Sequence, residues 1–140
     1  MPTVGVFAAI VDDRRRILLV KRNYGPRDWT PPGGALESRE SPLDGVSREV
    51  LEETGHGVDV HRLIGVYSAP FKDDLVLLFA ARITGRREDD ANREEIAEVA
   101  FLERADLPPL TPRTLQRVVD AYDGAPCVVR VFAGDSMPES

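Results

Sequence analysis

Residues 33–55 constrain the fold of this chain more than any other segment. They read GGALESRESPLDGVSREVLEETG and follow a pair of prolines. The segment predicts a glycine turn and then a helix, because Ser41 is a favourable N-cap and Pro42 suits the first helical position. Gly55 is placed to end the helix in the left-handed conformation. A short helix must therefore pack directly after a turn that exposes its backbone.

This helix carries three carboxylates within one turn. Advancing about 100° per residue predicts a core-facing stripe that consists of Leu43, Val46 and Val50. Directly beside that stripe lies an arc that contains Glu53, Glu49 and Glu52. Acidic side chains that share a helix face repel one another, so their concentration beside a glycine turn indicates binding of a hard divalent cation through oxygen. The alternative is a solvated face with salt bridges, which the turn and the position beside the core disfavour.

Two further residues of the helix have roles that the sequence leaves open. Gly45 falls in the same arc, where its missing side chain either leaves room for a metal-bound ligand or allows another element to pack closely. Arg48 lies one turn before Glu52 and is placed to orient a carboxylate.

The remaining chain predicts more strands than helices. Apolar runs and alternating segments predict strands over residues 4–11, 17–22, 58–67, 75–83, 96–102 and 127–132. A charged loop is expected over residues 86–93, and a second helix is expected from Thr111 and Pro112 to Gly124. Its predicted buried stripe consists of Leu115, Val118, Val119 and Tyr122. This pattern predicts the α+β class, with a mixed sheet covered by helices.

Length and composition limit the classes of protein that fit. The 140 residues are enough for one domain, expected over residues 1–133, with a mobile tail over residues 134–140. The net charge of −6 argues against binding of a nucleic-acid polymer. Cys127 is the only cysteine, which excludes a disulfide framework. With no signal-peptide layout and no apolar run of membrane length, we expect a cytoplasmic protein without a membrane partner.

The segment from Gly34 to Gly55 resembles the box of the Nudix family. Its pattern is G-x5-E-x7-R-E-U-x-E-E-x-G-U, where U is a bulky aliphatic residue. Gly34, Glu40 and residues 48–55 (REVLEETG) match every fixed glycine and charged position. The departure is His56 at the last U, a position of packing rather than of chemistry.

The resemblance implies a Nudix fold, an α/β/α sandwich around a mixed sheet. It also implies Mg²⁺- or Mn²⁺-dependent hydrolysis of a nucleoside diphosphate linked to another moiety. The metal ligands that it implies are Gly33 through its carbonyl, with Glu49, Glu52, Glu53 and a glutamate from a later loop. Glu94 and Glu95 are the candidates for that last ligand, and Glu95 is favoured.

The catalytic residues expected from this chemistry are Glu52, Glu53, Glu95 and Arg48. A metal neutralises the phosphate oxygens and acidifies a bound water, and a carboxylate within hydrogen-bond reach takes the proton. The sequence does not choose among the three glutamates as the base. Arg48 is expected to orient a carboxylate rather than to react.

The substrate is expected to be a small nucleotide. Lys21, Arg22 and Arg27 are candidates to meet phosphates, and Tyr24 is a candidate to stack on a base, although exposed strand ends explain the cations equally well. The first hypothesis is a nucleoside or deoxynucleoside triphosphate that is split to the monophosphate and pyrophosphate. One alternative is an ADP-ribose or other nucleotide-sugar pyrophosphatase, and another is a non-catalytic nucleotide-sensing module on the same fold. The protein is expected to be a monomer or a homodimer.

Overall fold

A computed structural model describes residues 1–86, 94–124 and 126–134 of the chain. It contains eight named strands and two α-helices in these residues, together with two short 3₁₀ turns. In chain order the elements are β1 (Thr3–Ala9), β2 (Arg16–Arg22), β3 (Trp29–Thr30), β4 (Gly33–Ala35), α1 (Pro42–Thr54), β5 (His56–Ala69), η1 (Pro70–Lys72), β6 (Asp74–Arg86), β7 (Ile96–Glu103), η3 (Arg104–Asp106), α2 (Pro112–Asp123) and β8 (Val128–Val131).

The strands form two sheets. The larger has the order β4-β1-β6-β5-β8, and the smaller has the order β3-β2-β7. β1 pairs with β6 in parallel, whereas β5 pairs with β6 in an antiparallel arrangement, so the larger sheet is mixed. The apolar run over residues 75–83 lies in β6 at the centre of this sheet, and the predicted strand over residues 127–132 is the edge strand β8.

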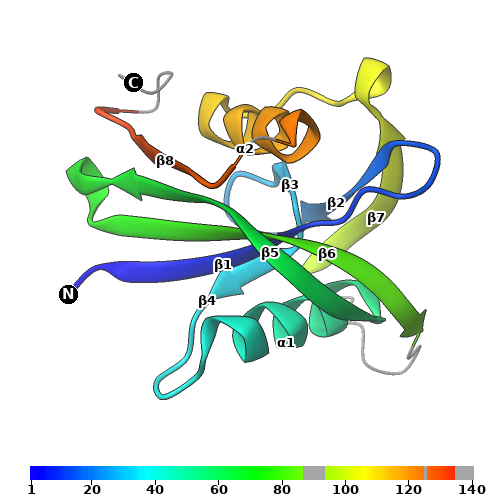
Figure 1. The fold of residues 1–140 in the computed structure, drawn as a ribbon, viewed down its shortest axis with the longest axis horizontal. Helices are drawn as coiled ribbons and strands as arrows, with labels where there is room; N and C mark the ends of the chain where they lie inside the picture. Colours follow the sequence, from blue (N-terminus) through cyan, green and yellow to red (C-terminus); the bar gives the residue numbers. More distant parts are fainter. Residues whose placement is uncertain (87–93, 125, 135–140) are drawn as a thin grey trace.

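The two α-helices cover opposite faces of the strands, α1 below and α2 above in Figure 1. Strand β2 shows how the sequence divides its side chains between the two layers. Leu18 packs in the cluster that contains Val46 and Val50 of α1, while Ile17 and Leu19 pack against Val118 of α2. This alternation buries both faces of the strand, as its continuous apolar sequence predicts. The α/β/α sandwich and the α+β class are confirmed.

The expected turn at residues 31–34 is wrong in its second half. Gly33, Gly34 and Ala35 form β4, which pairs with β1 at the edge of the larger sheet. The glycines are therefore required by close packing and not by a left-handed backbone. A Cβ atom on Gly33 would lie 2.2 Å from the carbonyl oxygen of Val6 and 2.5 Å from the ring of Phe7.

The predicted apolar stripes of both helices need correction. Leu43 is 54% exposed, because the first turn of α1 leaves its side chain in solvent, whereas Val46 and Val50 are fully buried. On α2, Val118 is buried, but Leu115 and Val119 are exposed and Tyr122 is only half-buried. The face of α2 that packs on the sheets instead buries Thr114, Gln116, Arg117 and Asp120.

Two expectations fall on residues that the structure does not describe. The charged loop expected over residues 86–93 lies outside the described residues from 87 onwards, and the expected tail does so from 135 onwards. In the described part of the chain, no helix is both long and apolar enough to cross a membrane.

Candidate active site

The carboxylate of Glu53 is buried where α1 meets β4. Its residue is 6% exposed, and its Oε1 accepts a hydrogen bond of 2.8 Å from the backbone N–H of Gly33. Burial raises the pKa of Glu53 to about 8, and the negative charges of Glu49 and Glu95 oppose its ionisation further. The surroundings of Glu53 therefore compensate its charged form only in part, and its pKa lies close to neutral pH.

Glu49 lies one turn earlier on α1 and faces the same strand. A Cβ atom on Gly34 would lie 2.8 Å from its carboxylate oxygens, so only glycine leaves this space open. Burial raises the pKa of Glu49, and the charges of Glu52 and Glu95 add to this effect while Arg48 opposes it. Glu49 and Glu53 are therefore two partly compensated carboxylates that both lie against β4, at the edge of the larger sheet.

Glu95 comes to this region from the segment before β7. The backbone N–H of Asn23 donates to the Glu95 carbonyl at 2.7 Å, and the Asn23 side chain donates to the Glu94 carbonyl at 3.2 Å. Because its charge raises the pKa of both Glu49 and Glu53, Glu95 belongs to the same electrostatic cluster.

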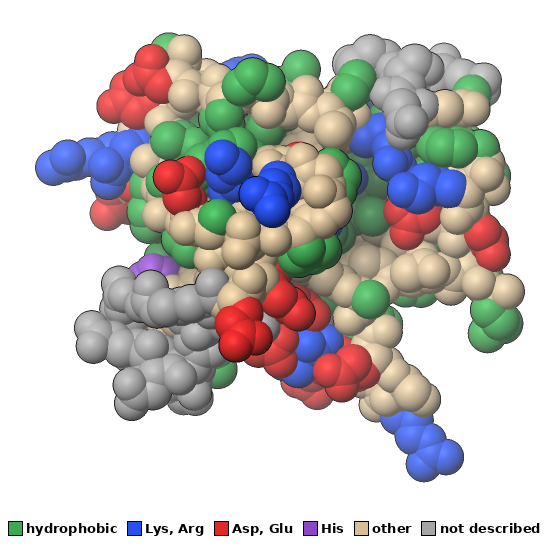
Figure 2. Space-filling view, turned by 180° about the vertical axis from the view of Figure 1, so that it is seen from behind, with side chains coloured by type: hydrophobic (Ala, Val, Ile, Leu, Met, Phe, Trp, Pro, Cys, Tyr) green, Lys and Arg blue, Asp and Glu red, His purple; other side chains and the backbone are tan. Residues whose placement is uncertain are grey.

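Arg48 connects the acids that surround it. Its guanidinium donates to Glu40 through two bonds of 2.7 and 2.9 Å and to Glu49 at 2.9 Å. It also reaches Glu52 at 3.2 Å and the Ala35 carbonyl at 3.3 Å. These bonds hold the pKa of Glu40 at about 2, and they raise the pKa of Arg48. Figure 2 shows acidic side chains gathered around basic ones low on the back face of the molecule.

Gly45 permits close packing on the same side of the helix. A Cβ atom there would lie 2.6 Å from the Leu36 side chain and 3.0 Å from a Glu40 oxygen. Of the two roles that the sequence left open, the structure favours packing, because Leu36 and Glu40 occupy the space.

The chemistry of the candidate ligands suits a hard divalent cation, although their carboxylates are not close together in this structure. All the candidate side-chain ligands are carboxylates, and the raised pKa values of Glu49 and Glu53 express negative charge that a cation would relieve. Among the described residues, however, no set of three or more His, Cys, Asp and Glu side chains is close enough to hold a metal ion. Arg48 spans Glu49 and Glu52 instead, so metal binding requires these side chains to turn.

A cavity of about 590 Å³ opens beside this cluster. It is lined by residues from β1, the end of β2 and the loop after it, β4, η1, the start of β6 and the start of α2, and it reaches Gly34. Of the four side chains expected to meet substrate, Arg22 and Tyr24 line it, whereas the described lining does not include Lys21 or Arg27. Arg22 is held by Asp28 through two bonds of 2.9 Å, and its guanidinium lies 5.6 Å from the centre of the Tyr24 ring.

Sequence reasoning missed the opposite wall of the cavity. Phe7, Lys72, Arg113 and Arg117 also line it, and they come from segments far apart in the sequence. The sequence carried little signal for this wall, because Arg117 lies between Gln116 and Val118 on a helix whose expected buried stripe was apolar.

Comparison with known proteins decides the family. The model of the NUDIX domain matches residues 1–122. The chain belongs to the Nudix family. Its class is that of a pyrophosphohydrolase, and members of this family generally use divalent metals.

Proteins similar to this chain are named for several activities. A putative 8-oxo-dGTP diphosphatase of Bacillus subtilis is 35% identical over 126 residues, which cover 89% of this chain and 83% of that protein. An ADP-ribose pyrophosphatase of Methanocaldococcus jannaschii is 34% identical over 107 residues, which cover 70% and 63% of the two chains. The solved structure of a NUDIX hydrolase from Nitrosomonas europaea superposes with a TM-score of 0.76 at 27% identity and covers 99% of this chain and 94% of that one.

Proposed function

We propose that this Nudix protein hydrolyses a nucleoside or deoxynucleoside triphosphate to the monophosphate and pyrophosphate, with Mg²⁺ or Mn²⁺. The observation that carries the proposal is the position of the cavity, which reaches Gly34 beside the carboxylate of Glu49. A nucleotide in the cavity would extend its phosphates toward the acids of α1. Tyr24, which is 48% exposed and lines the cavity, offers a ring for base stacking.

Five residues would hold the metal: Gly33 through its carbonyl, together with Glu49, Glu52, Glu53 and Glu95. When bound, the metal would neutralise phosphate charge and acidify a water molecule. Arg48 would orient the acids, because it already binds Glu40, Glu49 and Glu52. Glu40 lies outside the proposed ligand set and anchors Arg48.

The general base is one of Glu52, Glu53 and Glu95. Glu53 is held at Oε1 by the Gly33 N–H, which fixes its orientation without neutralising it. Glu52 is half exposed, so its side chain is free to turn from Arg48 toward a ligand. Glu95 approaches from another segment and needs no movement of α1. Each is placed to accept a proton from water, and separate glutamine variants would rank their contributions.

Among the possible substrates, the relatives support the triphosphate more broadly than the nucleotide sugar. The match to the putative 8-oxo-dGTP diphosphatase extends over 83% of that protein, and the match to the ADP-ribose pyrophosphatase over 63%. A pyrophosphatase acting on ADP-ribose or another nucleotide sugar is the second candidate.

The single described cysteine, Cys127, is exposed and free, which fits a cytoplasmic protein.

A product screen tests the proposal. Nucleoside triphosphates, oxidised guanine nucleotides and ADP-ribose would each be incubated with Mg²⁺ or Mn²⁺, with Glu53→Gln as the background control. We expect release of pyrophosphate and nucleoside monophosphate from a triphosphate. Orthophosphate as the first product, or preferred cleavage of ADP-ribose, would contradict the proposed substrate. Tight nucleotide binding without turnover would favour the sensing module.

The limits and assembly of the domain are also proposals. We propose that residues 1–133 form one catalytic domain that acts as a monomer or a homodimer. A chain truncated after Ala133 should keep full turnover, and light scattering of the same sample would give the mass.

A further inference from the structure

Arg117 is a buried guanidinium that forms no ion pair with a carboxylate in the described part of the chain. It is 8% exposed, and its Nη2 donates to Thr114 Oγ1 at 3.1 Å. Its Nε is buried and has no acceptor. Among the residues that the structure describes, no carboxylate forms an ion pair with it. A buried charge without a partner is costly to the fold, so its presence calls for a ligand or another form of compensation.

The groups that surround Arg117 compensate its positive charge only in part. Its guanidinium lies 5.2 Å from the centre of the Phe7 ring, a contact that supplies only weak compensation. Burial lowers its pKa to about 10, and the positive charges of Arg113 and Arg22 lower it as well, whereas Tyr67 and the negative charge of Asp74 oppose this shift. The side chain nevertheless remains a cation at neutral pH.

The cavity that Arg117 lines is basic although the protein is acidic. Its lining contains four cationic side chains and two carboxylates, and one of these carboxylates, Asp28, is engaged by Arg22 at 2.8 Å. The four cations are Arg22, Lys72, Arg113 and Arg117. In Figure 2, basic side chains border the hollow on this face. A net positive pocket of about 590 Å³ in a chain of charge −6 favours an anionic occupant.

The ring of Phe7 and the backbone of Gly33 connect Arg117 to the acids of α1. The ring of Phe7 packs so closely on Gly33 that a Cβ atom would lie 2.5 Å from it, and the N–H of Gly33 binds Glu53. Arg117 lies over the same ring. A polyphosphate that reaches the acids would thus have its other anionic groups near this guanidinium.

We propose that Arg117 binds a phosphate oxyanion of the ligand and determines specificity for substrates that bring this group into the cavity. The inference rests on the proposed polyphosphate substrate and adds a residue that recognises it. The fork of an arginine matches the oxygens of a phosphate, and Nε together with Nη1 would supply the donors. The alternative is that Arg117 donates its hydrogen bonds to oxygens at the edge of an uncharged base.

The test measures anion binding without catalysis. Wild type, Arg117→Met, Arg117→Lys and the matched control Arg14→Met, at an exposed arginine outside the cavity lining, would be titrated with inorganic pyrophosphate, orthophosphate and an uncharged nucleoside in EDTA, by calorimetry and thermal unfolding. We expect pyrophosphate to bind wild type and Arg14→Met, and to bind Arg117→Met about tenfold or more weakly. Arg117→Lys should bind with intermediate strength, because it keeps the charge and loses the fork.

The free proteins provide a second signature. If Arg117 is uncompensated without ligand, Arg117→Met should unfold about 3 °C or more above wild type. A lower unfolding temperature would show a structural role and overturn the proposal. Equal pyrophosphate binding by wild type, Arg117→Lys and Arg117→Met would also overturn it, as would loss of nucleoside binding alone. The test measures binding and not turnover, so it is independent of the proposed hydrolysis. A protein that does not hydrolyse nucleotides can still bind pyrophosphate through Arg117, and a protein that hydrolyses them can bind it without Arg117.

Discussion

Helices α1 and α2 begin and end by the same local rules. Ser41 Oγ accepts from the N–H of Asp44, and Thr111 Oγ1 accepts from the N–H of Thr114. Both helices have a proline in the first turn and a left-handed glycine after the last, with φ of 76° and 65°. Local sequence therefore places their ends, but it does not determine what their buried faces contain.

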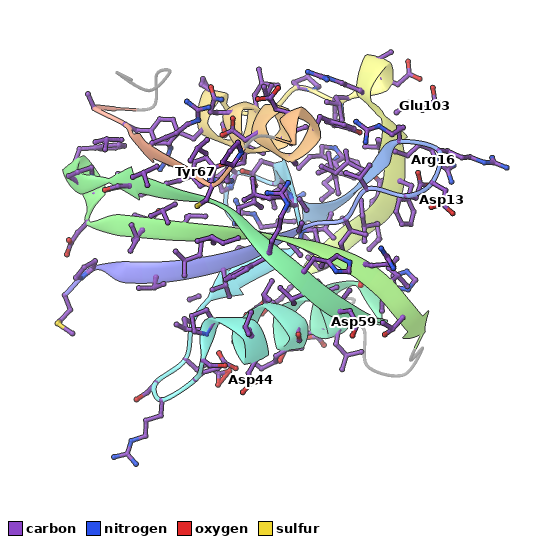
Figure 3. The ribbon with its side chains drawn as sticks, in the orientation of Figure 1. Asp13, Arg16, Asp44, Asp59, Tyr67 and Glu103 are labelled. Atoms are coloured by element: carbon purple, nitrogen blue, oxygen red, sulfur yellow. The ribbon has the colours of Figure 1, made fainter. Side chains whose placement is uncertain are left out.

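The helices differ in how each treats a buried acid. Asp120 of α2 accepts hydrogen bonds from Tyr67 at 2.8 Å, Gln116 at 3.0 Å and Arg130 at 2.7 Å. Figure 3 shows Tyr67 on β5, on the side of the sheet that α2 covers. Burial alone would raise the pKa of Asp120, but these bonds, with that of Arg130 foremost, bring it below its usual range.

Glu53 of α1 is compensated far less. Of the described residues, only the Gly33 N–H donates a hydrogen bond to it, and burial raises its pKa to about 8. The comparison separates an acid that stabilises the fold from one that is available for chemistry. Arg117 resembles Glu53 in that its buried charge has no ion-pair partner among the described residues. Asp120, on the same helix as Arg117, does have such a partner in Arg130.

The largest expected effect is on turnover in Glu53→Gln. We expect kcat to fall about 10³-fold or more with Mg²⁺, because the variant loses either a metal ligand or a proton acceptor. The fold should persist, since glutamine still accepts from Gly33. Steady-state kinetics and circular dichroism measure the two quantities. Turnover within tenfold of wild type would remove Glu53 from the site.

The same isosteric change at Asp120 should have the opposite consequence. Asp120→Asn should lower the free energy of unfolding by about 2 kcal/mol, because Arg130 loses its charged partner and Tyr67 its strongest acceptor. Turnover per folded molecule should change less than about twofold, since Asp120 is neither a proposed ligand nor a residue of the cavity lining. Urea unfolding of both variants checks the contrast. Equal stability of wild type and Asp120→Asn would end the distinction drawn between the two acids.

The pH dependence of stability should sharpen the comparison further. The folded-state pKa of Glu53, about 8, lies above the ordinary value of 4.5, so between these values the folded protein holds a proton that the unfolded chain has released. Unfolding then releases a proton, and the stability of the metal-free protein falls as pH rises through this window. The slope should approach about 1.4 kcal/mol per pH unit at most. Subtracting the curve of Glu53→Gln isolates this contribution, and parallel curves would contradict it.

The sequence predicted those parts of the fold that depend on neighbouring residues. The limits of α1, the central strand β6 and the edge strand β8 followed from caps and apolar runs. The extended form of Gly33 and Gly34 did not, because it depends on the approach of Phe7 and Glu49 from other segments.

The site divides in the same way. The candidate acids of α1 were predicted from their spacing, and Glu95 was predicted from the family resemblance; their roles stay predictions. Arg117 could not be found, because only the folded chain shows that Thr114 and Phe7 surround it and that a carboxylate partner is missing. Hydrophobic periodicity also failed on α2, since Tyr67 and Arg130, remote in sequence, allow Asp120 to be buried.

The smallest expected effect distinguishes the predicted face of α2 from the observed one. Leu115→Ala should change the free energy of unfolding by less than about 0.5 kcal/mol, because Leu115 is 40% exposed and alanine favours the helix. Val118→Ala, one turn later, should cost about 2 kcal/mol, because Val118 is 1% exposed and packs against Ile17 and Leu19. The predicted stripe would make the two losses similar. Chemical unfolding that showed comparable losses would mean that Leu115 is buried in solution and that α2 packs by its apolar side.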